Sequence, residues 1–256
     1  MWAAILIREA RLRAGLTQQQ LADLSGRKRS VIARWERGVI EPGLETFLEI
    51  IGVCGFDLPL ELVPRDDVAR ERLRKNSLLS PERRLRRLVP PTDRFDPYAM
   101  LAALERRRIA YVVIGAFARI AHGAEETADV LEVVPSTHGD NPHRLQLALA
   151  DIGAAPGSSS AGAGRGSASL PAGEFDSAHG RVFVVPEPPG TRGGYDDLRR
   201  AAAREPIGRG LRVPVASNPD LARMLAELGR EDDLPKLFDL RRLQALERRP
   251  AEDAGG

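Results

Sequence analysis

Residues 15–22 read Gly-Leu-Thr-Gln-Gln-Gln-Leu-Ala, and this stretch decides the fold of the amino-terminal part of the chain. Thr17 predicts a helix N-cap, and Gln20, three residues later, completes a capping box. Leu21 begins the apolar side of this helix, and Gly26 ends it because glycine tolerates a left-handed backbone. The stretch therefore predicts a short, capped helix followed by a tight turn.

The next helix is predicted to begin near Lys28 and to separate apolar from polar residues. Val31, Ile32 and Trp35 lie at spacings that place them on one inward face. The opposite face then presents polar, basic and small side chains. These are Arg29, Ser30, Ala33, Arg34 and Arg37.

The charge of the chain is concentrated rather than large. Thirty-eight basic and 36 acidic residues give a formal net charge of +2, so total charge alone does not indicate a nucleic-acid partner. Residues 27–37, in contrast, hold five basic residues against the single acid Glu36. A basic cluster on one helix face is the electrostatic footprint of a nucleic-acid-binding surface.

With Gly38 and Glu41-Pro42, these motifs resemble the Cro/C1-type (XRE family) helix-turn-helix regulators. The resemblance covers about a quarter of the chain. It implies an all-α domain of about five helices over residues 1–63, whose third helix enters the major groove of double-stranded DNA, usually as a homodimer.

The resemblance also implies roles for individual residues. The guanidinium groups of Arg29 and Arg34 suit the acceptor pair of guanine, whereas Arg27 and Arg37 suit phosphates. Glu36 is expected to pair with a nearby arginine. Lys28 replaces the hydroxyl residue usual at this cap, so the third helix is expected to start less sharply. The DNA-contacting set is expected to be Gln18, Arg27, Lys28, Arg29, Ser30, Arg34 and Arg37.

Beyond this domain the pattern changes twice. Residues 64–94 are rich in arginine and bracketed by prolines, which predicts a basic linker with one or two short helices. Residues 95–250 then alternate between helical and strand-like segments, which predicts an α/β domain with a mixed sheet. The expected strands are 111–114, 130–134, 181–185 and 211–216. The expected helices are 97–107, 116–122, 141–152, 196–204, 219–228 and 234–248, and the Gly/Ala/Ser-rich tract 153–173 is expected to be a loop.

Residues 111–131 resemble the minimal nucleotidyltransferases related to abortive-infection toxins. In that family a strand ends in two glycines that open a helix, and the next strand carries an Asp-x-Asp pair. Alternate residues of a strand point the same way, so two such carboxylates converge on magnesium ions. The resemblance therefore implies a vestigial nucleotide pocket at Gly115, Ala116 and Asp129.

The departures from that family fall on its chemistry. Asp129 fits the first carboxylate, but Leu131 and Phe183 stand at the second and third positions, and neither side chain binds magnesium. Glu132 is a poor substitute because it faces the opposite side of the strand from Asp129. We therefore expect a nucleotidyltransferase-like fold with no catalytic residues, no metal site and no cofactor.

Together these features predict a bacterial, cytoplasmic, sequence-specific DNA-binding repressor whose second domain binds a ligand or a partner protein. Two alternatives remain open: a toxin-like nucleotidyltransferase that uses Asp129, and an antitoxin-like autorepressor that sequesters a neighbouring toxin. The single cysteine, Cys54, cannot form an intramolecular disulfide and lies in an apolar run, which predicts a core position. No run approaches the roughly 18 apolar residues that a membrane span requires.

Overall fold

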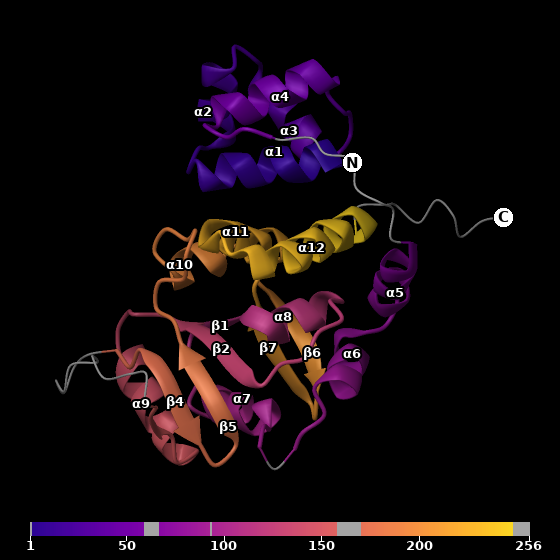
Figure 1. Cartoon of the computed structure of the whole chain (residues 1–256). Helices are drawn as coiled ribbons and strands as arrows, with labels where there is room; N and C mark the ends of the chain where they lie inside the picture. The colour runs from indigo at the N-terminus through magenta and orange to yellow at the C-terminus, as the bar shows by residue number, and fades with distance from the viewer. Residues whose placement is uncertain (1, 59–66, 93, 158–169, 248–256) are drawn as a thin grey trace.

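The computed structural model describes residues 2–58, 67–92, 94–157 and 170–247. Its amino-terminal part is a helical bundle (Figure 1). The bundle consists of α1 (Trp2–Arg13), α2 (Gln18–Leu24), α3 (Arg29–Glu36) and α4 (Leu44–Val53). Ile7, Leu21, Ile32 and Ile50 are fully buried in its core, and Cys54 packs with them, as the apolar run predicts.

The helix starts follow the capping residues. The Thr17 hydroxyl accepts a hydrogen bond from the Gln20 backbone N–H at 3.2 Å, and the Gln20 side chain accepts one from the Thr17 N–H at 2.8 Å. The predicted capping box is therefore confirmed. Helix α3 begins after Lys28, whose side chain makes no cap hydrogen bond, in agreement with the missing hydroxyl.

The arginine-rich segment after the bundle contains α5 (Asp67–Ser77) and α6 (Pro81–Leu88). Helix α5 packs against the last helix of the chain, and α6 packs against helix α8 (Gly115–His122). The segment expected to be a basic linker thus packs on the second domain. The bundle has four helices among the described residues up to 58, where about five were expected.

Buried Arg84 joins this segment to the second domain. Its guanidinium group donates to the backbone carbonyl of Asn76 at 2.9 Å, to that of Ser77 at 2.7 Å and to that of Ala121. These acceptors belong to α5 and α8, so one side chain holds α5, α6 and α8 together.

The second domain is built on a seven-stranded mixed sheet with strand order β3-β4-β5-β2-β1-β7-β6. The sheet pairs β1 with β2 antiparallel, but pairs β1 with β7 and β2 with β5 parallel. The strands are β1 (Tyr111–Ile114), β2 (Val130–Pro135), β3 (Ala155–Pro156), β4 (Gly173–Ser177), β5 (Gly180–Val184), β6 (Ala203–Gly208) and β7 (Leu211–Val215). The other helices are α7 (Pro97–Arg106), α9 (Asn141–Asp151), α10 (Tyr195–Leu198), α11 (Asn218–Leu228) and α12 (Leu234–Glu247), with a short 3-10 turn at Glu231–Asp233. The expected α/β domain with a mixed sheet is confirmed.

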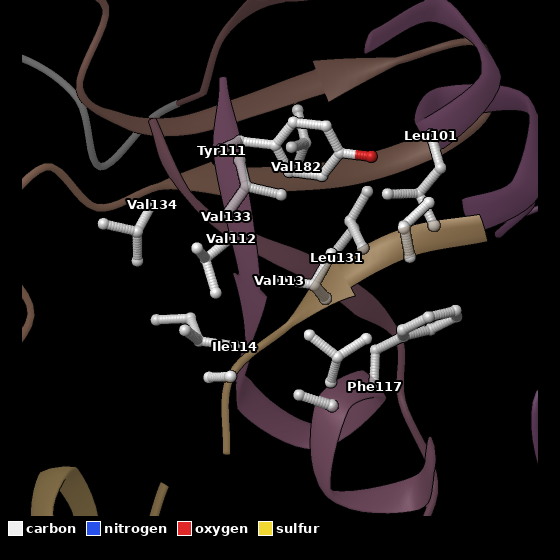
Figure 2. Packing of buried hydrophobic residues seen from close by; sticks show 14 of the residues in the cluster. Leu101, Tyr111, Val112, Val113, Ile114, Phe117, Leu131, Val133, Val134 and Val182 are labelled. Carbon is white, nitrogen blue, oxygen red and sulfur yellow. The ribbon is translucent and has the colours of Figure 1, made fainter. Parts of the chain in front are cut away.

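The two faces of the sheet differ in what covers them. Leu131 is fully buried and lies on the same side of the sheet as Leu101 of α7 and Phe117 of α8, whereas Val112 and Ile114 point to the other side (Figure 2). Register pairs Ile114 with Glu132, so Glu132 lies on that second side. The side of the sheet that carries Ile114 and Glu132 faces α11 across a cavity.

Three strands were missed in the sequence: β6, β4 and the two-residue β3, which lies within the tract 153–173 expected to be a loop. The helix predicted over 196–204 ends at Leu198, and residues 203–208 form β6, an edge strand that tolerates Pro206. Strands β6 and β7 are joined by Arg209 and Gly210, both at positive φ, as a tight hairpin turn requires. Strand β4 begins at Gly173, within the tract expected to be a loop; residues 158–169 of that tract lie outside the described residues.

Helix α1 connects the two domains. It packs on α11 and α12, which lie between the bundle and the sheet (Figure 1). Arg241 of α12 donates to both carboxylate oxygens of Glu9, at 2.7 and 3.1 Å. At the end of α1, the Arg192 side chain donates to the carbonyl oxygens of Gly15 at 3.3 Å and Ala14 at 3.4 Å. A cation at this position also complements the helix dipole.

None of the helices in the described ranges is long and apolar enough to cross a membrane.

Replacing Arg84 by alanine is expected to lower the free energy of unfolding by about 3 kcal/mol, because two buried and one partly buried carbonyl groups lose a charged donor. Arg83→Ala, at the exposed neighbouring position, is the matched control and is expected to change stability by less than about 0.5 kcal/mol. Urea unfolding followed by far-UV circular dichroism measures both values. Equal stabilities of the two variants would contradict the assigned role of Arg84.

Candidate functional site

The outer face of α3 is the first candidate site. Arg29, Ser30 and Arg34 are exposed, and Ile32 and Trp35 on the inner face are buried, as the spacing predicts. The second domain leaves this face uncovered. Within the described residues, neither Arg29 nor Arg34 has an ion-pair partner, which leaves both guanidinium groups available.

Glu36 fixes the position of α3 from inside the bundle. Its carboxylate accepts two hydrogen bonds from Arg11 of α1, at 2.6 and 3.0 Å, and one from the Gln18 side chain at 2.9 Å. The side chain of Glu36 is 4% exposed and that of Arg11 is 11% exposed. The expected pairing of Glu36 with an arginine is confirmed. Arg11 lies 25 residues before Glu36, so short-range spacing does not reveal it as the partner.

The other residues expected to contact DNA lie around this face and differ in the bonds that they already make. Gln18 is the first residue of α2, and Lys28 is the exposed N-cap of α3. Arg27 pairs with Glu49 at 3.0 Å with both side chains well exposed, an arrangement that costs little to break. Arg37 bonds the Ala33 carbonyl at 3.1 Å and remains exposed.

The second candidate site is a cavity of about 280 Å³ in the α/β domain. It lies between the sheet, the start of α8, the segment Val185–Pro189 and α11. Most of its wall is apolar, and its polar lining comes from few side chains. The lining includes Gly115, Arg119, Glu132, Phe183, Leu228 and Arg230.

The carboxylate of Glu132 lies at the amino terminus of α8. The backbone N–H of Ala116 hydrogen-bonds it, and a Cβ atom on Gly115 would lie only 1.3 Å from its Oε2 atom. Gly115 also has φ +70°, so only glycine suits this position on both grounds. Burial raises the pKa of Glu132, against the opposing effects of Arg119 and the Ala116 N–H. A helix amino terminus attracts anions, and here a side chain of the same domain supplies the anion.

Asp129 does not join this cavity, contrary to its expected place in one pocket with Gly115 and Ala116. It precedes β2, is largely exposed and pairs with Arg181, which also bonds Glu174. Together Asp129 and Arg181 line a different cavity, beside Phe95.

The expected position of the second carboxylate also needs correction. In the sheet, Leu131 pairs with Val182 and Glu132 pairs with Phe183, so Leu131 and Phe183 point to opposite faces. Leu131 lies in the core, and Phe183 lines the cavity beside Glu132. The assignment was one residue out of register, and the residue that faces the cavity on β2 is Glu132.

Magnesium does not fit this donor set. A two-metal site needs several carboxylates that converge, whereas the described lining offers the single carboxylate of Glu132 beside the phenyl ring of Phe183 and the guanidinium of Arg119. Within the described ranges, no three histidine, cysteine or acidic side chains gather as a metal site would require.

Comparison with known families and structures supports the amino-terminal assignment. Residues 7–60 match the family described as helix-turn-helix (HTH_3). Among solved structures, the chain is similar to the antibiotic-resistance factor ANT(2'')-Ia in solution, with 13% identity over 59% of this chain and 81% of that one. The TM-score is 0.39, too low to carry an argument about the second domain. The comparison with curated proteins found no match.

Replacing Glu36 by alanine is expected to lower the free energy of unfolding of the bundle by about 3 kcal/mol or more, because Arg11 is then buried without its partner. Glu45→Ala, at an exposed position of α4, is the control and is expected to be close to neutral. Both tryptophans, Trp2 and Trp35, lie in α1 and α3, so tryptophan fluorescence during urea unfolding reports on the bundle. A loss similar to that of Glu45→Ala would argue against a structural role for Glu36.

Proposed function

We propose that the chain is a sequence-specific DNA-binding transcriptional regulator that acts as a homodimer. The helix-turn-helix match makes the bundle a DNA-binding domain of this class. The observation that carries the proposal is the outer face of α3, where Arg29, Ser30 and Arg34 are exposed and the two arginines have no ion-pair partner among the described residues.

Each residue then has a separate task. Arg29 and Arg34 read guanine by paired hydrogen bonds to O6 and N7 in the major groove, and Ser30 contacts a neighbouring base edge. Arg27, Lys28 and Arg37 bind phosphates and set the register of α3 on the duplex. The Gln18 carboxamide donates a hydrogen bond to buried Glu36. It can contact a phosphate at the start of α2 only if this bond is broken or shared. We therefore assign Gln18 a weaker phosphate contact than the arginines.

The second domain is proposed to be a nucleotidyltransferase-like domain without transferase activity, which binds a ligand or partner protein. Support comes from its cavity, where Phe183 replaces a carboxylate and Glu132 fills the amino terminus of α8. A labelled nucleoside triphosphate incubated with the protein, magnesium, RNA and protein acceptors is expected to leave no label on any acceptor. Transfer that Glu132→Gln or Asp129→Ala abolishes would overturn this part of the proposal.

DNA binding is tested directly with the promoter region of the chain's own gene. In a gel-shift titration at moderate salt, the full chain is expected to bind this fragment at least about 1,000-fold more tightly than a scrambled fragment of equal length. Equal affinity for both fragments would reject sequence-specific binding.

Substitutions at α3 distinguish residues that contact bases from residues that bind phosphates. Arg29→Ala is expected to weaken promoter binding by about 1–3 kcal/mol and to relax preference at one base pair, since a paired contact to guanine is lost. Arg37→Ala is expected to weaken binding to all sequences alike and to reduce the salt slope by about 1. Arg72→Ala, an exposed arginine of α5, serves as the control. Identical sequence preferences for Arg29→Ala and the unmodified chain would remove Arg29 from the reading set.

A further inference from the structure

The cavity beside Glu132 shares its walls with the elements that hold the bundle. Helix α11 supplies Leu221, Met224 and Leu228 to the cavity, and the same helix packs against α1. The segment with Pro188 and Pro189 forms another wall and continues to Arg192, which bonds the end of α1.

The charged side chains at and near the cavity differ in whether they already have an ion-pair partner. Arg119 is bound by both carboxylate oxygens of Glu126, at 2.7 and 2.9 Å, so its charge is already matched. Lys236, the other cation that acts on Glu132, donates to Asp233 at 2.7 Å. Among the described residues, Glu132 receives the Ala116 N–H but has no such bidentate partner. The other cation of the lining, Arg230, is exposed, and the rest of the wall is mostly apolar. A largely buried carboxylate that lacks a charged partner is best complemented by a cationic hydrogen-bond donor. Because the surrounding wall is mostly apolar, this donor should be attached to an apolar group.

We propose that this cavity is a binding site for a small apolar molecule carrying a primary amine, with the ammonium group on Glu132 and the apolar body against Phe183 and α11. This inference rests on the proposed ligand-binding role of the second domain. The cavity volume of about 280 Å³ lies at the lower end of ligand pockets, which fits a molecule the size of an aryl-alkyl amine.

The same geometry disfavours a phosphate group at the amino terminus of α8. In a helix-terminus phosphate site the backbone N–H groups face the phosphate, but here the carboxylate of Glu132 occupies that place against Gly115. A triphosphate would meet this negative charge at close range, with Arg119 already paired to Glu126. The site therefore selects for positive charge at its inner end.

Calorimetric titration of the full chain without DNA tests the assignment with three probes of defined chemistry. 2-Phenylethylamine is expected to bind saturably and at least about tenfold more tightly than phenylacetate, its anionic counterpart, and Mg-ATP is expected not to bind. Glu132→Gln is expected to weaken amine binding at least about tenfold, since it removes a charge-assisted hydrogen bond and keeps an acceptor for Ala116.

A second pair of variants tests the location without touching Glu132. Leu228 and Leu147 are each 37% exposed, but only Leu228 lines the cavity. Leu228→Trp is expected to block amine binding, and Leu147→Trp is expected to leave it unchanged. Absence of saturable amine binding, tighter binding of phenylacetate or Mg-ATP, or equal binding to the Leu228→Trp and unmodified chains would each overturn the proposal. Because no DNA is present, none of these results depends on whether the bundle reads a promoter.

Discussion

Helix α1 packs against both domains, and the position of α3 depends on both contacts. On one side Ile7 and Ala10 enter the core of the bundle, and Arg11 holds Glu36 at the end of α3. On another side Glu9 is bound by Arg241 of the second domain. Burying two charged pairs on one short helix is costly unless each is well matched, and both have bidentate geometry. The second domain therefore orients the bundle through the same helix that orients α3.

In the second domain, the candidate site depends on the contact of Glu132 with the amino terminus of α8. A conventional phosphate site would leave the amino terminus of α8 open, with glycine allowing a close approach of the ligand. This chain keeps glycine at position 115 but fills the space with the carboxylate of Glu132. The helix dipole is then complemented internally, and what remains of the site is a mostly apolar cavity with one acidic end.

The parts predicted from sequence are those set by local chemistry. The capping box at Thr17, the inward face of α3 and the central strands around Val113 follow from short-range patterns, and the structure agrees with them. Strand β6 was missed because Pro206 argues against a strand unless the strand lies at a sheet edge, and edge position is a property of topology. The partner of Glu36 was unknown for the same reason, since the contact with Arg11 spans 25 residues.

The candidate site of the second domain shows a different limit. The family resemblance pointed to Gly115 and to the strand that follows, and it placed the carboxylate positions on Asp129 and Leu131. A shift of one residue along a strand exchanges the two faces, so this small error moved the expected site from the cavity to the core. Only the pairing of β2 with β5, which sets Glu132 beside Phe183, reveals which residues share a face.

The arrangement of the cavity gives a physical route between the two domains. A ligand there contacts α11 and the segment that leads to Arg192, and these same elements hold α1. Coupling requires that the ligand interact differently with two arrangements of these elements, since equal contacts in both would shift nothing. It is also reciprocal: if a ligand in the cavity alters the affinity of α3 for DNA, DNA alters the affinity of the cavity for that ligand by the same factor. The shared helix α1 offers a path for such coupling, because it packs against both α3 and α11.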